Sequence, residues 1–135
     1  QALQMGADLA YMGTRFINVN ESMADNSYQK MIMDSKAEDI IYTAAVSGVN
    51  ASFLRPSLEA MGITEDLWKQ TKKIDFGSEL DHAKEEAKAW KTIWSAGQGV
   101  TSISDVKPVA ELISQLKVEF EKALLKQKEN YKYFF

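Results

Sequence analysis

Residues 7–16 constrain the fold of this chain more than any other stretch. They form a short apolar run that ends abruptly at Gly13 and Thr14, followed by the cation Arg15. A run of this kind, bounded by turn residues and too short for a helix, is typical of a buried strand. Gly13 lets the backbone come close to a group at the strand's end, and Thr14 adds a hydroxyl there. The pattern predicts either a phosphate-binding strand end or a core strand followed by a tight turn, and these residues alone leave both open.

Length limits how much of a fold the chain can contain. At 135 residues it is long enough for one domain with a sizeable core. A complete (β/α)8 barrel needs roughly 250 residues. The chain begins without Met, on residues typical of a helix end capped by Gly6. We therefore expect it to be the C-terminal piece of a longer protein.

The charge balance and the absence of cysteine exclude several classes of function. Lys and Arg number 16 and Asp and Glu number 19, for a formal net charge of −3, which provides no basic field for nucleic acid or anionic lipid. No apolar run approaches the length of a membrane span, and no signal-peptide pattern is present. Without Cys there is no disulfide scaffold or sulfur-ligated metal, which fits a reducing compartment. We expect a cytoplasmic protein that binds neither nucleic acid nor membrane.

Hydrophobic spacing and turn residues predict a series of mostly short elements along the chain. In order, they are a helix over residues 27–35, a strand over 39–47 stopped by Gly48, a helix from Pro56 that ends before Gly62, a helical turn within 64–71, a longer helix over 78–94, and a last helix from Pro108 to about Leu124. The charged and aromatic tail over residues 126–135 is expected to fray unless it docks on a partner.

Three stretches, in the same order as in a known family, carry a resemblance. They are residues 1–16, residues 37–43 with 53–56, and residues 94–100 with 108–112. Together they resemble the nitronate monooxygenase (2-nitropropane dioxygenase-like) FMN flavoproteins and cover about the first 120 residues.

The resemblance implies an α/β fold: the C-terminal portion of an FMN-binding (β/α)8 TIM barrel with its small α/β cap domain. Residues 1–17 would be the last barrel repeat, with a strand that ends in the FMN phosphate loop. Residues 18–77 would form the cap, residues 78–128 the helices that return to the barrel, and residues 129–135 a tail.

The resemblance also implies the residues that bind the cofactor. Tyr11, Met12, Gly13 and Thr14 match the FMN-binding stretch position by position, and backbone N–H groups around a glycine, with a hydroxyl, can neutralise a phosphate. Gln98, between Gly97 and Gly99, would line the flavin or substrate cavity.

Two tryptophans share the spacing of Gln98. Trp90, Trp94 and Gln98 are four residues apart, so on a helix they would share one face. This predicts a substrate-pocket role for Trp90 and Trp94, with ordinary packing as the alternative. The same residues resemble the branch of the family that reduces quinones with NADH more than the branch that oxidises nitronates.

No catalytic residue and no metal site are predicted within the chain. The single histidine, His82, lies in an acid-rich first helical turn typical of a solvated face. With one His and no Cys, the sequence also does not predict a transition-metal site.

The resemblance therefore implies part of an FMN-dependent oxidoreductase that acts on a small molecule, a nitronate or a quinone, with NAD(P)H as a further partner. We expect the chain alone to be inactive, and to need the missing N-terminal part of the barrel or to self-associate. The alternatives are a non-catalytic helical interaction or dimerisation module and a flavin-dependent enoyl-thioester reductase.

Overall fold

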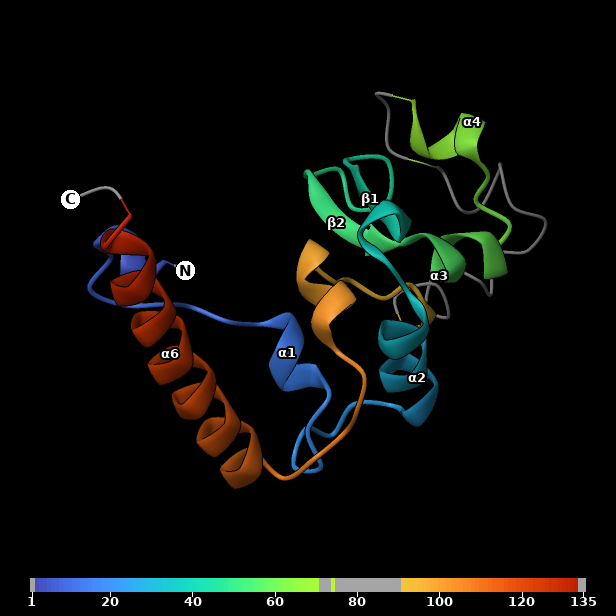
Figure 1. The fold of residues 1–135 in the computed structure, drawn as a ribbon. Coiled ribbons are helices and arrows are strands. Elements are labelled where there is room, and N and C mark those ends of the chain that lie inside the picture. Colours follow the sequence, from blue (N-terminus) through green and yellow to red (C-terminus); the bar gives the residue numbers. More distant parts are fainter. Residues whose placement is uncertain (1, 71–73, 75–90, 134–135) are drawn as a thin grey trace. The chain divides into compact units, whose positions relative to one another are not determined.

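The computed structural model describes residues 2–70, 74 and 91–133 (Figure 1). Contacts within the chain divide it into two compact units. Unit 1 comprises Gln1–Met23 with Val106–Phe135, and unit 2 comprises Ala24–Asp105. Most of the helix predicted over residues 78–94 lies outside the described residues, and so do His82 and Trp90.

Unit 1 opens with a 3₁₀ turn, η1 (Leu3–Met5), that ends at Gly6. Gly6 has φ 95°, a left-handed conformation that glycine adopts without steric cost at a helix end. The predicted cap at Gly6 is confirmed. The chain then runs to the short helix α1 (Thr14–Ile17).

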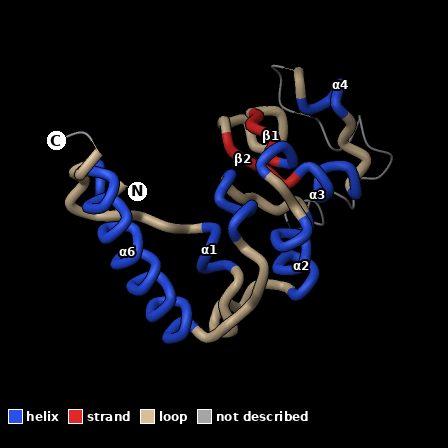
Figure 2. The backbone as a smooth tube through the Cα atoms, viewed as in Figure 1, coloured by secondary structure: helices blue, strands red, loops and turns tan. Residues whose placement is uncertain are grey.

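Residues 7–12, predicted as a buried strand, form a loop instead (Figure 2). Leu9 is 87% exposed and Tyr11 is fully exposed. A parallel strand needs a neighbouring strand to pair its N–H and C=O groups. Within the described residues, the paired strands belong to a separate hairpin in unit 2. The strand prediction is therefore wrong here, because the apolar run has no strand beside it.

The last helix, α6 (Val109–Tyr131), begins directly after Pro108, as predicted. Its first N–H group is capped from a distant part of unit 1, because both carboxylate oxygens of Glu21 accept from the Val109 N–H, at 3.0 and 3.1 Å. The helix continues to Tyr131, so the segment predicted to fray is helical up to that residue. None of the described helices is long and apolar enough to cross a membrane.

A short parallel contact joins the segment that follows α1 to the segment that precedes α6. Val19 and Lys107 form an isolated parallel bridge, and the Asn20 N–H donates to the Lys107 carbonyl at 3.1 Å. Together with the Glu21 cap, this bridge fixes the start of α6 within unit 1.

An apolar groove of about 440 Å³ lies between α6 and the N-terminal segment. Its walls are mostly aliphatic and aromatic side chains: Ala2, Leu3, Ala10, Met12, Ile113, Leu116, Lys117, Glu119, Phe120 and Ala123. Leu112, on the same helix, is buried. Few other apolar side chains of unit 1 are buried, so its own core is small.

Unit 2 is built around an antiparallel hairpin of β1 (Ile40–Thr43) and β2 (Ala51–Leu54). Ile40 pairs with Leu54 and Thr43 pairs with Ala51 at the two ends of the register. β1 confirms a strand within residues 39–47, although it ends earlier, and Gly48 turns the chain with φ 81°. β2 was not predicted from hydrophobic spacing, because four residues are too short for a clear alternation.

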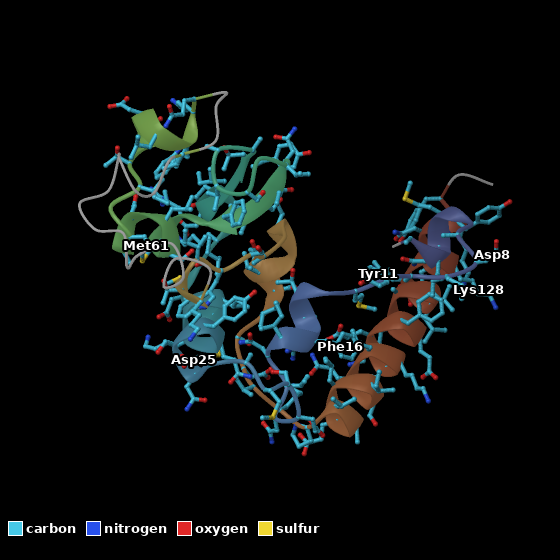
Figure 3. The ribbon with its side chains drawn as sticks, turned by 180° about the vertical axis from the view of Figure 1, so that it is seen from behind. Asp8, Tyr11, Phe16, Asp25, Met61 and Lys128 are labelled. Carbon is cyan, nitrogen blue, oxygen red and sulfur yellow. The ribbon has the colours of Figure 1, made fainter. Side chains whose placement is uncertain are left out.

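The helical elements of unit 2 include α2 (Asn26–Asp34), η2 (Ala37–Asp39), α3 (Arg55–Ala60), α4 (Glu65–Trp68) and η3 (Gln98–Ser102). Three helices of unit 2, α2, α3 and α4, confirm predicted helical segments, whereas the 3₁₀ turns η2 and η3 were not predicted. Asp25 caps α2, since its side chain accepts from the Ser27 N–H at 2.7 Å (Figure 3). Pro56 stands in the first turn of α3, and Gly62, with φ 76°, follows the helix.

The core of unit 2 lies between the hairpin and these helices. Its buried members are Ala45, Val46, Phe53, Leu58, Ile63 and Ile74. Ile74 is tied in by its backbone, because its N–H donates to the Ala45 carbonyl at 2.7 Å. Unit 2 therefore has a hydrophobic core of its own.

Glu21 is expected to stabilise α6 through its cap. Glu21→Ala removes the acceptor of the Val109 N–H and should lower the free energy of unfolding of unit 1 by about 1 kcal/mol, the usual cost of losing an N-cap. Circular dichroism at the helical band, followed during urea unfolding, measures this loss. The matched control is Glu121→Ala, an exposed position within α6, and equal effects from the two variants would contradict the cap.

Candidate functional site

The predicted cofactor corner stands at the start of α1. Gly13 is the N-cap residue of that helix, and its carbonyl accepts from the Phe16 N–H at 2.9 Å. Thr14 is the first helical residue and is half-buried. A bend at Gly13 followed by a helical turn thus replaces the strand end that the sequence predicted.

Gly13 occupies open space. A Cβ atom placed on it would meet no heavy atom within 4 Å, and its φ of −102° is one that any residue adopts. Gly6 differs, because its φ of 95° strains any other residue. Packing and conformation within the described chain therefore give no reason for a glycine at position 13.

The residues around Gly13 are accessible. Tyr11 lies on the loop that leads into α1 (Figure 3), and its side chain is fully exposed. Met12 is partly exposed and lines the apolar groove against α6. Arg15 donates from Nη1 to the Asn18 carbonyl at 3.2 Å, so its guanidinium helps to close the turn after α1.

Gln98 begins η3 in unit 2, where its side chain is exposed. Gly97 precedes it in extended conformation and accepts from the Val100 N–H at 3.2 Å. Gly99 follows it, and a Cβ atom there would also meet nothing within 4 Å. Val100 is buried and anchors the turn, so Gln98 is presented at the surface from a short, fixed element.

Trp94 is not on a helix with Gln98, which corrects the predicted shared face. Lys91 and Thr92 are helical, but residues 93 and 94 are not, and Ser95 forms an antiparallel bridge with Phe53. Beside β2, the Leu54 N–H donates to the Trp94 carbonyl at 2.8 Å. The helix ends earlier than four-residue spacing predicted because this segment pairs with the sheet instead.

The Trp94 side chain is half-buried against α2. Its ring stacks on Tyr28, with centroids 5.1 Å apart and planes 17° apart, and the Tyr28 hydroxyl donates to the Ser95 carbonyl. The Trp94 indole N–H donates to the Lys91 carbonyl at 3.1 Å. The sequence predicted Tyr28 only as part of the helix over residues 27–35, because hydrophobic spacing does not report a ring contact between residues so far apart in the chain.

An ion pair fixes the element beside η3. η2 contacts η3 within unit 2, and Asp39 at the end of η2 pairs with Arg55 of α3. The Asp39 carboxylate also accepts from the Lys36 N–H at 2.9 Å. The Arg55 hydrogen bond, followed by the Lys36 N–H, lowers the pKa of Asp39 below its ordinary value of 3.8.

The predicted site residues therefore fall into two groups. Tyr11, Met12, Gly13 and Thr14 belong to unit 1, whereas Trp94 and Gln98 belong to unit 2. Across the described ranges, the structure contains no cluster of three or more His, Cys, Asp or Glu that could hold a metal ion.

Comparison with a solved structure defines the class of protein. The chain matches a mutant of FabK from Thermotoga maritima with a TM-score of 0.65 and 25% sequence identity, over 94% of this chain and 38% of that chain. The fold class is that of a (β/α)8 TIM barrel, of which the chain contains a mixed α/β part, as predicted.

Sequence comparison gives the family. The nitronate monooxygenase family model matches residues 1–119, and the chain belongs to that family. It is 26% identical over 129 residues to a nitronate monooxygenase of Paraburkholderia phytofirmans, covering 91% of this chain. The chain spans about a third of the length of that relative, 34%.

The Asp39–Arg55 pair is expected to make unit 2 sensitive to acid. Because the pKa of Asp39 is lowered in the folded chain, its contribution to stability is present above about pH 3.8 and is lost as the pH falls through the lowered pKa. The unfolding midpoint of Asp39→Asn should therefore lie below that of the wild type near pH 7, and the two should converge in acid as the pH falls through the lowered pKa of Asp39. Thermal unfolding at neutral and at acid pH measures the difference. Asp66→Asn, at an exposed acid of α4, is the control, and a gap that persists in acid would refute the assignment.

Proposed function

We propose that this chain is part of an FMN-dependent oxidoreductase, in which residues 1–17 close the flavin phosphate site and residues 18–77 form the cap. Residues 78–128 would return to the barrel and residues 129–135 would be its tail. The observation that carries the proposal is Gly13, a glycine in open space within the residues 1–119 that the family model matches.

The residues at this corner suit a phosphate. Gly13 leaves the backbone uncovered, and the Thr14 hydroxyl can donate to an oxygen. Tyr11 and Met12 would contribute backbone contacts, because the Tyr11 side chain turns to solvent in this chain. FMN supplies the electron transfer when it is bound, and the protein supplies binding, orientation and exclusion of water.

Gln98 would line the flavin or substrate cavity, and the tryptophans would have a substrate-pocket role. An exposed amide on a fixed 3₁₀ turn can hold a polar substrate group by donating and accepting hydrogen bonds. Trp94, and Trp90 beyond the described residues, would offer flat apolar surface to the substrate. The substrate would be a nitronate or a quinone, with NAD(P)H as the electron donor for the quinone.

The similarity to FabK keeps a flavin-dependent enoyl-thioester reductase as a second candidate. Supplying the protein with each substrate class in turn separates the activities: a nitronate with oxygen, a quinone with NADH, and an enoyl thioester with NADH.

The apolar groove of unit 1 favours an alternative function, that of a non-catalytic interaction module. An apolar groove beside a long amphipathic helix is a surface on which a partner helix can dock, as in an interaction module. A colourless protein whose mass doubles with concentration would support the module, whereas a yellow protein with flavin absorbance would support the oxidoreductase.

The 135 residues alone are expected to bind FMN weakly and to show no turnover. In the proposed barrel, the first phosphate loop and the strand ends that carry catalytic groups come from the other part of the fold. Titration of free FMN with the chain, followed by quenching of flavin fluorescence, measures this. Binding in the nanomolar range by the isolated chain would contradict the proposal that the FMN site needs the other part of the barrel.

Gly13→Ala is the decisive variant. In the protein that supplies the other barrel strands, it should weaken FMN binding at least tenfold, about 1.4 kcal/mol, because a methyl group would occupy the space proposed for the phosphate. The chain itself should fold as before, since that methyl group meets nothing within 4 Å. Flavin fluorescence gives the affinity, and circular dichroism gives the fold.

Two further variants sharpen this test. Gly13→Val should lower affinity further, and Thr14→Ser, which keeps the hydroxyl, should leave it within about twofold. If Gly13→Ala retains wild-type FMN affinity while folding normally, position 13 does not face the phosphate and the proposed function loses its support.

A further inference from the structure

Tyr28 joins α2 to the segment that leads into Gln98. Its hydroxyl donates to the Ser95 carbonyl, and its ring stacks on Trp94 at 5.1 Å. Burial raises the pKa of Tyr28, so the hydroxyl keeps its proton near neutral pH. One side chain from α2 therefore contacts two successive residues of an extended segment.

The same segment is held along its backbone. The Trp94 N–H donates to the Ser57 hydroxyl at 3.1 Å, and the Ala96 N–H donates to the Ser52 carbonyl at 3.3 Å. These bonds fix residues 94–96 to β2 and α3 on one side. Tyr28 holds the same residues from α2. This helix also contacts η3.

Gln98 needs such support because it stands between two glycines. Gly97 and Gly99 have no side chains to pack, and glycine loses more conformational freedom on ordering than any other residue. Val100 anchors the turn after Gln98, and residues 94–96 anchor it before. The position of Gln98 thus depends on how firmly residues 94–96 are held.

We propose that Tyr28 is a positioning residue, which acts through Trp94 and Ser95 to hold the turn that presents Gln98. The inference rests on the proposed function only for the role of Gln98 toward flavin or substrate. Tyr28 itself is assigned no contact with either of them.

The test uses the 135-residue chain labelled with ¹⁵N. Backbone order parameters of Gln98 and Gly99 are measured by nuclear spin relaxation in the wild type, Tyr28→Phe and Tyr28→Leu. Tyr28→Phe removes the hydroxyl and keeps the stack, whereas Tyr28→Leu removes both. Tyr42→Phe is the matched control, an exposed tyrosine of β1 in the same unit, and Ile74 reports on the core.

In the wild type we expect order parameters near 0.85 at Gln98 and Gly99, the value of rigid backbone. They should fall below about 0.6 in Tyr28→Leu and to an intermediate value in Tyr28→Phe. Ile74 in these variants, and Gln98 in Tyr42→Phe, should keep the wild-type values. A loss of stability alone does not change the order parameters of the folded state. The measurement therefore distinguishes a local effect of Tyr28 on Gln98 from a general contribution of Tyr28 to the stability of unit 2.

Unchanged order parameters at Gln98 and Gly99 in both Tyr28 variants would overturn the proposal, whatever happens to the unfolding midpoint. An equal fall at Ile74 would overturn it too, since Tyr28 would then order the whole unit. No flavin is present in these measurements. A failure of Gly13→Ala to weaken FMN binding would therefore refute the proposed function and leave the Tyr28 result readable.

Discussion

The pairing of β2 on both of its edges is the constraint on which unit 2 depends. One edge pairs with β1, and the other exchanges hydrogen bonds with residues 94–96, about forty positions along the chain. This second contact closes the unit, because it returns the chain to the hairpin after α4. It also determines where η3 begins, and hence where Gln98 is presented. The hydrophobic core between hairpin and helices stabilises an arrangement that the backbone bonds specify.

Unit 1 shows what happens to a segment that lacks such pairing. Residues 7–12 have the composition of a buried strand, but strand formation requires hydrogen-bond partners on a neighbouring chain segment. Because no described part of the chain pairs with it, the segment stays a loop and Leu9 faces solvent. α6 has no such dependence, since its bonds are internal and its first N–H group is capped by Glu21. The helix therefore forms in full while the strand does not.

This contrast also explains how far the sequence could predict the structure. Local signals succeeded: Pro56 and Pro108 marked helix starts, and Gly6 and Gly62 marked helix ends. Predictions that depended on distant partners failed. Residues 7–12 have no neighbouring strand among the described residues. Trp94 lies outside the helix because its carbonyl accepts from the Leu54 N–H of β2. For the site, the resemblance supplied Gly13 and Gln98, but neither spacing nor composition could supply Tyr28, whose contacts with Trp94 and Ser95 exist only after folding.

The glycines separate what the chain needs for folding from what it does not. Gly6, Gly48 and Gly62 have positive φ, so each is required by a turn of the chain itself. Gly13 and Gly99 have no such conformation, and a Cβ atom on either would meet nothing within 4 Å. A glycine costs conformational entropy on folding, so one that folding does not require needs another reason to be present. These two stand beside Thr14 and Gln98, in the segments that match the family, and close approach of a group from outside the described chain would supply that reason in both places.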